Sequence, residues 1–447
     1  MDTQNGLAQA GDVSIEDLYL ISGTGTYIFV LDYLIELNIY EDIFSNFLTG
    51  SIMISDSANI IKSLPIIGEE YLAVKITTPS FPSSIHKTFR VYAVTNRNIV
   101  TDTGTQTYIL HFCSNEGIND TSTPIFKNFS GKIDNVVSNI FEKYIETNRR
   151  YIVNSSGVKQ DTVKTQLTIL NDTDNNVKFV SPGWSPFKCI NWLSNKSMPS
   201  NGKACNYLFW ETSQQFYFGS METIFSASQN ENSPVNMGTY NYSPPSLQPE
   251  NDINAKMFLI ENLEISKTAD YMISNNNGYL SSRTITLNLF NKKYDIIDYS
   301  HINSFNDYTH LAKSGSDIPV FSTKVDNTPE TNIFVHSTHP NLFTGFKDNV
   351  NERIGRYFGN RISHMLELSN FKLNISIPGR TDVEAGGVIN LKFPDIRPPT
   401  EADISLGKYD SRYSGNYLVT AIRHKITILK HSMTLEIVKD SLENKEN

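Results

Sequence analysis

The chain has 447 residues, which is more than one hydrophobic core usually supports, so two to four domains are expected. Its formal net charge of −9 disfavours a protein that grips nucleic acid through phosphate contacts, so we expect no specific nucleic-acid binding. Aromatic residues make up 11% of the chain, and Asn, Ser, Thr and Ile are frequent, which favours strands and polar loops over long helices.

The cysteines and the hydropathy of the chain indicate the cellular compartment in which the protein is made. Cys113, Cys189 and Cys205 form no C-x-x-C pair, so we expect buried thiols of a protein made in a reducing cytosol rather than a disulfide framework or a zinc site. The N-terminal segment lacks the basic and apolar runs of a signal peptide, and no apolar run approaches about 18 residues. The sequence therefore predicts neither a signal peptide nor a membrane span.

Residues 1–117 are predicted to form a first domain, a tube-like β-barrel. The run Gly50–Ser80 alternates apolar and polar residues at both of its ends around a turn-rich centre. This is the period-2 pattern of half-buried strands. Similar alternation predicts further strands at 88–94 and 107–113.

Residues 118–228 are predicted to form a mixed α+β middle domain. Apolar residues recur at helical spacing over 133–145. Ser185 is a capping residue followed by proline at the first helical position, which predicts a second helix there. The chain then returns to a strand pattern over 208–218.

The rest of the chain is predicted to hold two more domains. Residues 229–347 form a strand- and loop-rich insertion or third domain, because a polar, proline-rich stretch precedes an alternating run at 284–290. Residues 348–447 combine a helix over 348–368 with a second tube-like β-barrel domain. The predicted fold class is β-dominated α+β, with two tube-like β-barrel domains flanking or combined with mixed α+β middle domains.

No catalytic, cofactor-binding or metal-ligating residue is assigned. Glu69 and Glu70 are adjacent carboxylates on a strand edge, where neighbours point to opposite faces, so a solvated edge is the better interpretation than a glycosidase pair. His336 and His339 have a spacing that could hold a metal on a helix, but Pro340 and the turn residues nearby argue against a helix. We therefore expect no cofactor.

Two further features have both a functional and a packing interpretation. His424 is interpreted as a barrel or packing residue rather than a base. Trp184, Trp192 and Trp210 could form a sugar-stacking platform, but their local periodicities favour packing in the middle domain. Because nucleophile elbows, zinc-binding helices and Walker loops are also missing from the sequence, we expect a protein that is not an enzyme.

Several segments together resemble one family. The pattern GSIMISDS followed by LPIIGEE resembles the first tube-like barrel of the baseplate central hub proteins of contractile-tailed bacteriophages, the T-even-type tail hub family. GNYLVTAIRHKI with MTLEIVKDS, and IPGRTDVEAGGVINLKFP at 377–394, resemble the second barrel of that family. GWSPFKCINWLSNKS with NYLFWETSQQFYFGSMETIF resembles its middle domain. The segments occur in the family's order, and 229–254 and 300–344 are the parts less clearly covered.

The resemblance implies a structural protein of the virion, located in the tail baseplate and synthesised in the host cytoplasm. It implies a homotrimer whose pseudo-six-fold ring adapts the hexameric tail tube to the trimeric central spike and lets DNA pass. The implied partners are the cell-puncturing tail spike protein, the tail tube protein, baseplate wedge proteins and the tape measure protein. An acidic inner wall would repel the passing DNA. For ring formation we expect Leu72–Thr77 and Leu418–Ile426 to serve as rim strands that pair or pack across subunits.

Two other functions remain open at this point. A tail-associated cell-wall hydrolase or carbohydrate-binding protein would be favoured by tryptophans exposed in a groove beside a carboxylate pair. The hub of a phage-tail-like contractile injection system would keep the same architecture. Because the sequence holds no Gly-rich or β-helical spike repeat, we expect the spike to be a separate chain.

Overall fold

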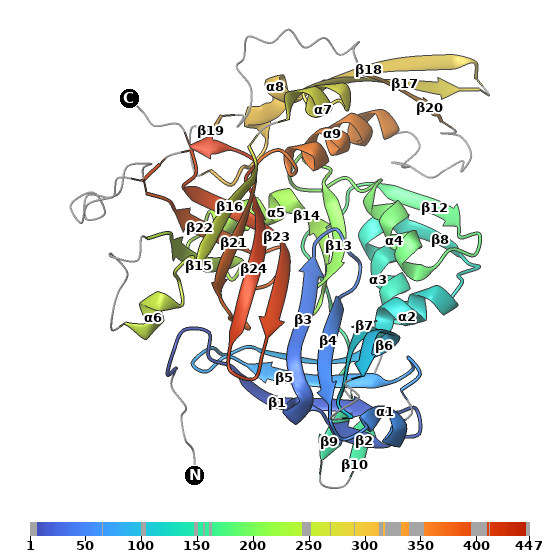
Figure 1. The fold of residues 1–447 in the computed structure, drawn as a ribbon. Helices are drawn as coiled ribbons and strands as arrows, with labels where there is room; N and C mark the ends of the chain where they lie inside the picture. The colour runs from blue at the N-terminus through green and yellow to red at the C-terminus, as the bar shows by residue number, and fades with distance from the viewer. Residues whose placement is uncertain are drawn as a thin grey trace.

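The computed structural model describes residues 7–64, 66–99, 104–146, 151–154, 157–160, 163–243, 252–268, 270–289, 291–312, 316–317, 332–338, 353–394, 409–410 and 412–443. Strands dominate it, and most of the helices lie beside and above one large sheet, with α1 at its lower end (Figure 1). The predicted β-dominated α+β fold class is confirmed.

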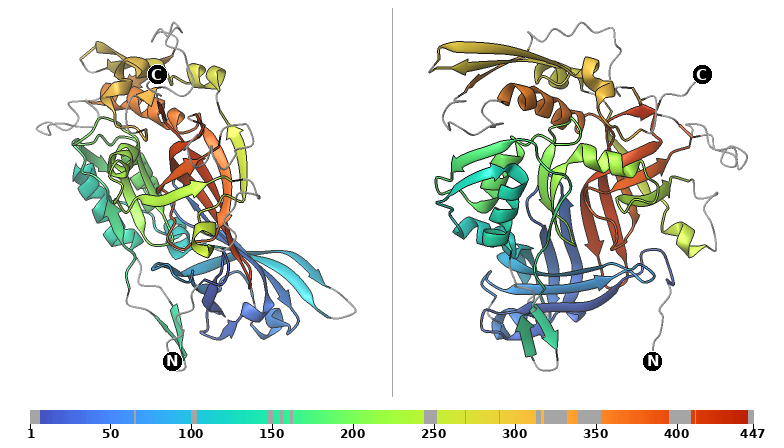
Figure 2. Two further views of the ribbon diagram at one scale, coloured as in Figure 1. Left: turned by 90° about the vertical axis from the view of Figure 1, so that its left-hand side faces the viewer. Right: turned by 180° about the vertical axis from the view of Figure 1, so that it is seen from behind.

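Strands from both ends of the chain form one large sheet. Its strands are β1 (Ser14–Ile21), β2 (Tyr27–Phe29), β3 (Leu34–Asp42), β4 (Thr49–Asp56), β5 (Tyr71–Thr77), β6 (Ser84–Ile99), β7 (Gln106–Ser114), β15 (Asn236–Asn241), β16 (Asn262–Lys267), β21 (Lys372–Pro378), β22 (Val388–Lys392), β23 (Gly415–Ile426) and β24 (His431–Val438). The hydrogen-bonding order is β16-β21-β24-β23-β3-β4-β7-β6-β5-β1-β2, and β22 joins β15 to β23. At the junction of the two halves, β3 and β23 are antiparallel, with Ile39 opposite His424. The blue and red strands accordingly lie side by side in Figures 1 and 2.

Two separate apolar cores underlie this shared sheet. In the N-terminal core, Ile52 and Ile54 of β4 are fully buried, and each such side chain contributes about 1.5–3 kcal/mol. The residue at position 50 is a glycine because a Cβ there would lie 2.3 Å from the ring of Phe112. In the C-terminal core, Leu435 of β24 is fully buried among residues of the second half and the middle region. The halves are thus joined by main-chain pairing, and each has its own core, to which the other half contributes Ile426 in the N-terminal core and Ile43 in the C-terminal core.

The middle region packs helices against two small sheets. Its elements are α2 (Asn115–Ser122), β8 (Asn128–Lys132), α3 (Ile133–Ile140), a π-helical turn at Phe141–Ile145, the β9 (Tyr151–Asn154) and β10 (Gly157–Gln160) pair, β11 (Leu167–Ile169), β12 (Asn176–Val180), α4 (Pro186–Ser194), β13 (Tyr207–Glu211), β14 (Phe216–Ser220) and α5 (Met221–Ser228). Ser185 caps α4, and its hydroxyl accepts a hydrogen bond from the Lys188 N–H at 3.4 Å. The helices predicted over 133–145 and after Ser185 are confirmed.

An upper layer consists of a three-stranded sheet and a long helix. Its elements are α7 (Tyr271–Asn276), β17 (Ser281–Asn288), β18 (Lys293–Ser300), α8 (His301–Ser304), β20 (Ile333–Ser337) and α9 (Ile354–Glu367). The central strand, β17, is antiparallel to β18 and parallel to β20. Shorter elements elsewhere are α1 (Ile60–Ser63), α6 (Ile253–Lys256), β19 (Ser316–Asp317) and β25 (Leu442–Glu443). The strand expected at 284–290 is confirmed up to Asn288, and the helix expected over 348–368 is confirmed from Ile354.

Among the described residues, one face of the upper sheet is covered by a helix and the other carries exposed side chains. Helix α9 lies on the covered face, where Phe358 contacts Phe334 with ring centroids 5.3 Å apart (Figure 1). Alternation along the strands puts a second set of side chains on the opposite side. We call this set the outer apolar face, and its members are Tyr294, Ile296, Ile333 and Val335, each between 51% and 65% exposed.

The predicted rim strands occupy interior positions instead. Leu72–Thr77 lies in β5, which pairs with β1 on one side and β6 on the other. Leu418–Ile426 lies in β23, which pairs with β24 and also with β3 and β22. Neither segment is therefore an edge strand that could pair across subunits, because alternation reveals a strand but not its place in a sheet. That the two segments pack across subunits stays a prediction. Within the described residues, β2 and β16 end the pairing order. The domain boundaries at 117, 228 and 347 stay predictions.

Candidate functional site

The adjacent carboxylates Glu69 and Glu70 have different environments. Glu70 is 2% exposed, and its carboxylate accepts hydrogen bonds from the main-chain N–H groups of Ile67 at 2.7 Å, Gly68 at 3.0 Å and Glu69 at 3.1 Å. Charge-assisted bonds of this kind hold the turn that precedes β5. The predicted solvated edge is therefore wrong for Glu70, whereas Glu69 is exposed.

The two predicted histidine features are structural where they can be placed. His336 lies on β20, 4.1 Å from the Phe358 ring, and His339 lies outside the described residues. His424 is fully buried, with its Nδ1 3.1 Å from His431 Nε2 and its Nε2 3.7 Å from Glu41 Oε1. The packing interpretation of His424 is confirmed. In the part of the chain that the structure describes, no group of three or more His, Cys, Asp or Glu residues is placed to hold a metal ion.

The three tryptophans contribute to packing, as predicted. Trp210 is 1% exposed, stacks on Tyr217 at 5.3 Å and donates from Nε1 to the Ala385 carbonyl at 3.0 Å. Trp184 and Trp192 are half-buried, with centroids 5.7 Å apart, and pack against the core of the middle region. Because no row of exposed indole rings results, the arrangement does not favour a sugar-stacking platform.

The three cysteines are free and buried, as expected from the sequence. Burial raises the pKa of Cys113 and of Cys205 to about 12. Burial also raises the pKa of Cys189. A reactive cysteine needs a thiolate and access to solvent, so these thiols serve as core residues.

The segment at 377–394, one of those that resemble the hub family, joins both halves of the chain. Arg380 is 4% exposed, donates to Asp382 from Nε at 3.0 Å and from Nη2 at 2.6 Å, and donates to Tyr240 at 3.1 Å. The neighbouring Thr381 donates to the Ser83 carbonyl at 2.7 Å. This segment therefore ties the loop after β5 to the C-terminal half through buried polar contacts.

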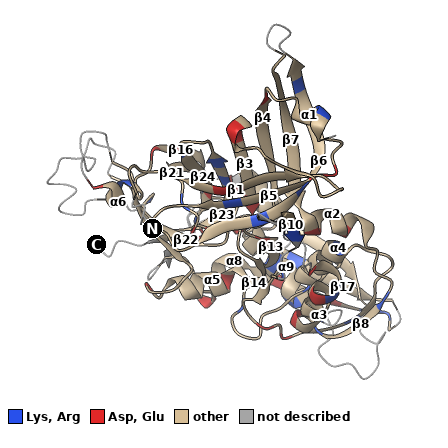
Figure 3. Ribbon diagram, turned by 90° about the horizontal axis from the view of Figure 1, so that it is seen from below, with Lys and Arg blue, Asp and Glu red and all other residues tan. Residues whose placement is uncertain are grey.

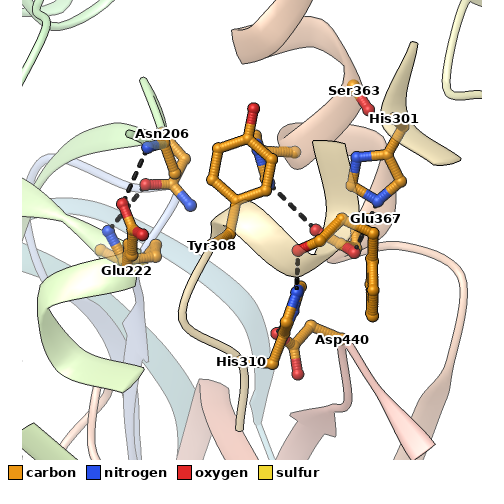
Figure 4. Close-up of polar contacts among 12 residues, drawn as sticks. Asn206, Glu222, His301, Tyr308, His310, Ser363, Glu367 and Asp440 are labelled. Atoms are coloured by element: carbon orange, nitrogen blue, oxygen red, sulfur yellow. Dashed lines mark hydrogen bonds and ion pairs between the residues drawn. The ribbon is translucent and has the colours of Figure 1, made fainter. Parts of the chain in front are cut away.

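A buried cluster around Glu367 joins α9 to α8 (Figure 4). His301 Nε2 lies 3.0 Å from Glu367 Oε1, and His364 Nδ1 lies 3.1 Å from Glu367 Oε2. Burial alone would raise the pKa of Glu367, but the charges and hydrogen bonds of His301 and His364 outweigh it and hold that pKa well below its usual range. Ser363 donates to the Tyr279 carbonyl at 2.6 Å, so its hydroxyl does not point to either histidine as a nucleophile would.

A second buried pair, His310 and Asp440, connects the 301–311 segment to the chain that follows the last strand of the large sheet. His310 Nδ1 lies 2.9 Å from Asp440 Oδ2, and its Nε2 lies 2.8 Å from the Phe305 carbonyl oxygen. Burial alone would lower the pKa of His310, but the hydrogen bond and charge of Asp440 outweigh it and raise that pKa to about 9. Nearby, Glu222 of α5 accepts from the Thr309 N–H at 3.1 Å. The 301–311 segment is thus held by three separate parts of the fold.

These clusters can hold elements together, but their members are buried away from any substrate. His301, His364 and Glu367 are each at most 3% exposed. Sequence patterns do not reveal these clusters, because partners such as His301 and Glu367 are 66 positions apart. The one local signal was the H-x-x-E spacing of His364 and Glu367, which puts both side chains on the same face of α9.

The charged residues of the large sheet are mixed in sign (Figure 3). On its solvated face, Glu36 accepts from Arg423 at 3.2 Å and from Lys425 at 2.9 Å, and Lys372 lies 2.9 Å from Glu436. Cross-strand pairs of this kind neutralise one another and contribute little stability each. Separately, no helix among the described residues has both the length and the apolar character that crossing a membrane would require.

Comparison with known proteins identifies the fold. No family model matches the chain, and no curated protein sequence matches it. The structure of the tail protein from Neisseria meningitidis MC58 is similar with a TM-score of 0.51 and 11% identity, over 95% of this chain and 96% of that one. The 43 kDa tail protein of prophage MuSo2 from Shewanella oneidensis gives 0.49 and 6%, over 95% and 98%. An E. coli type VI secretion system component gives 0.42 and 7%, over 97% and 77%.

The first of these matches carries the assignment. It extends over nearly all of both chains, so the arrangement of the whole molecule, not of one domain, is shared. The chain has the β-rich fold of a tail protein. The resemblance to a tail hub that the sequence indicated is confirmed at the level of the fold.

Proposed function

We propose that the chain is a structural subunit of a tail baseplate, and that it acts as the central hub. The observation that carries this proposal is the tail-protein fold over nearly the full length of the chain. A fold by itself does not specify a function, so the step from fold to role is an argument by analogy. Three features of this chain's own structure support that step.

The first feature is the shared sheet. Strands of the N-terminal and C-terminal halves, each with its own apolar core, share one sheet within the subunit. A ring of three such subunits has six near-equivalent positions while remaining three-fold, which is what matching a hexameric tube to a trimeric spike requires. We propose a homotrimer on this ground, with the tail tube, the spike, wedge proteins and the tape measure protein as neighbours in the virion.

The second feature is the outer apolar face. Soluble monomers rarely expose contiguous apolar patches unless they mark an interaction site. Ile296 and Val335 are more than half exposed on a sheet that already has its other face covered by α9. A component of a large assembly would bury this face against a neighbour.

The third feature concerns the buried polar clusters. Glu367, Asp440 and Arg380 each form hydrogen bonds with partners within the chain. These contacts hold its layers together. Such contacts suit a mechanically rigid part, so the role that we propose is structural and not enzymatic. We also propose that DNA passes through the ring. An acidic inner wall remains a separate proposal, and the mixed charges of the solvated sheet face do not favour it at that face.

The test is the native mass of the purified chain, alone and co-expressed with a candidate spike protein. A hub is expected to give a species of three times the 50.5 kDa subunit mass on its own, or a larger complex that contains three such subunits together with the spike. A chain that stays monomeric with the spike and tube candidates present would overturn the proposal. Release of sugar from purified peptidoglycan by the chain would instead establish the hydrolase.

A further inference from the structure

A cavity lies where the middle region meets the second half of the large sheet. It has a volume of about 380 Å³, which lies within the range of small-ligand sites. Its walls include Leu170, Trp210, Tyr217, Ile224 and Met237, and Glu384 is the one charged residue among the described residues that line it. The walls thus suit an apolar chain, and one carboxyl group is available to fix a polar end.

Glu384 has one oxygen occupied and one available. Its Oε2 accepts hydrogen bonds from the Thr212 hydroxyl at 2.7 Å and from the Tyr217 hydroxyl at 3.3 Å. Its Oε1 accepts no hydrogen bond from any residue that the structure describes, and it is not among the buried polar atoms without partners. A carboxylate can accept about four hydrogen bonds, so this oxygen can still take a donor from a ligand.

The charges around Glu384 favour a cation in the cavity. Four groups influence the pKa of Glu384. They are the carboxylate of Glu41 on β3, the hydroxyls of Thr212 and Tyr217, and the ammonium of Lys87 on β6. Lys87 is paired with Glu211. Glu41 accepts from the N–H groups of Ala385 at 3.0 Å and Ser213 at 2.8 Å and, despite its burial, has a pKa below its ordinary value because of His424 and these bonds. Burial and the negative charge of Glu41 raise the pKa of Glu384 to about 7.

We propose that this cavity binds a primary ammonium group carried on a short apolar chain, with the ammonium on Glu384 Oε1 and the methylenes against Trp210 and Met237. An ammonium group donates up to three hydrogen bonds, and its positive charge is attracted by the negative charges of Glu384 and Glu41. A carboxylate ligand would be repelled by them. Aromatic walls also favour a cation over an anion. The lysine side chain of a partner protein and a free alkylamine share this chemistry. The inference concerns a site, and it stands whether or not the chain is a hub.

The experiment uses the full chain and compares ligands that differ in the ammonium group alone. Nα-acetyl-lysine methylamide is compared with Nα-acetyl-norleucine methylamide, and n-pentylamine is compared with n-pentanol, by calorimetry and by Trp fluorescence. At pH 8 the amines should bind at least about tenfold more tightly than their neutral partners, as expected for one buried charged contact. A tighter lysine derivative would indicate a partner side chain, and a tighter pentylamine a free amine.

The dependence on pH and on Glu384 separates this site from unspecific binding. A carboxyl group with a pKa near 7 is mostly ionised at pH 8 and mostly protonated at pH 6, so affinity for the amines should fall about tenfold between them. The Glu384→Gln variant should bind amines and neutral ligands equally at both pH values, and Glu69→Gln, at an exposed carboxylate, should behave as the unmodified chain. Equal binding of amine and neutral partner by the unmodified chain, a pH-independent affinity, or no amine binding at millimolar concentrations would each overturn the proposal. The pH series needs no variant, so it decides even if Glu384→Gln fails to fold.

Discussion

The His310–Asp440 pair predicts a pH-dependent stability that Asp440→Asn should remove. The raised pKa of His310, about 9 against an ordinary 6.5, corresponds to about 3 kcal/mol of preferential binding of the proton by the folded state. Because the folded pKa lies above the unfolded one, this stabilisation is fully present below about pH 6.5 and is lost as the pH rises through about 9. Asp440 also accepts a hydrogen bond from the Leu311 N–H at 3.1 Å, and an asparagine side chain can accept the same bond.

The assay is urea unfolding followed by Trp fluorescence at pH 6 and at pH 10. The variant should be less stable than the unmodified chain by about 3 kcal/mol at pH 6, and by much less at pH 10, where His310 is neutral in both proteins. Glu16→Gln, which removes an exposed pair with Lys75, is the matched control and should cost about 0–1 kcal/mol. A stability difference that is the same at both pH values would refute the reasoning. So would an NMR titration of His310 with a midpoint near 6.5.

Three further outcomes are expected. Gly379→Ala should lower the melting temperature, because its Cβ would lie 2.0 Å from the His431 ring and overpacking costs about 1–3 kcal/mol, whereas Gly23→Ala, with open space around it, should not. Ile296→Asp on the outer apolar face should leave the unfolding free energy within about 0.5 kcal/mol but weaken assembly with tail partners, while Ile297→Asp, which faces α9, should destabilise the isolated chain. The thiols should resist a thiol reagent at pH 8 in the folded chain and all three should react in urea, and rapid labelling of the folded chain would contradict their burial.

The local structure could be predicted where the signal is local. Alternation identified β4, β5 and β7, and Ser185 before proline identified the start of α4. The pairing of β3 with β23 has no such signal, because the partners are nearly 400 residues apart and any alternating strand could occupy either place. The same limit explains why the predicted rim strands turned out to be interior.

The functional residues were harder to predict than the strands. Glu70 was interpreted with Glu69 as part of a solvated strand edge, yet three main-chain N–H groups stabilise its buried carboxylate. Glu384 stands within a segment that suggested the family, but its raised pKa depends on its burial and on the charge of Glu41, and both arise only in the tertiary fold. Sequence patterns give residue types and spacing, whereas the chemistry of a carboxyl group depends on its neighbours in space.

The most direct test of the proposed hub is electron microscopy of the chain purified with its spike and tube candidates. Two-dimensional class averages should show a ring with a central hole and three-fold symmetry, with six similar lobes where the two halves of each subunit alternate. A compact particle without a hole, or a ring whose symmetry is not three-fold, would contradict the account.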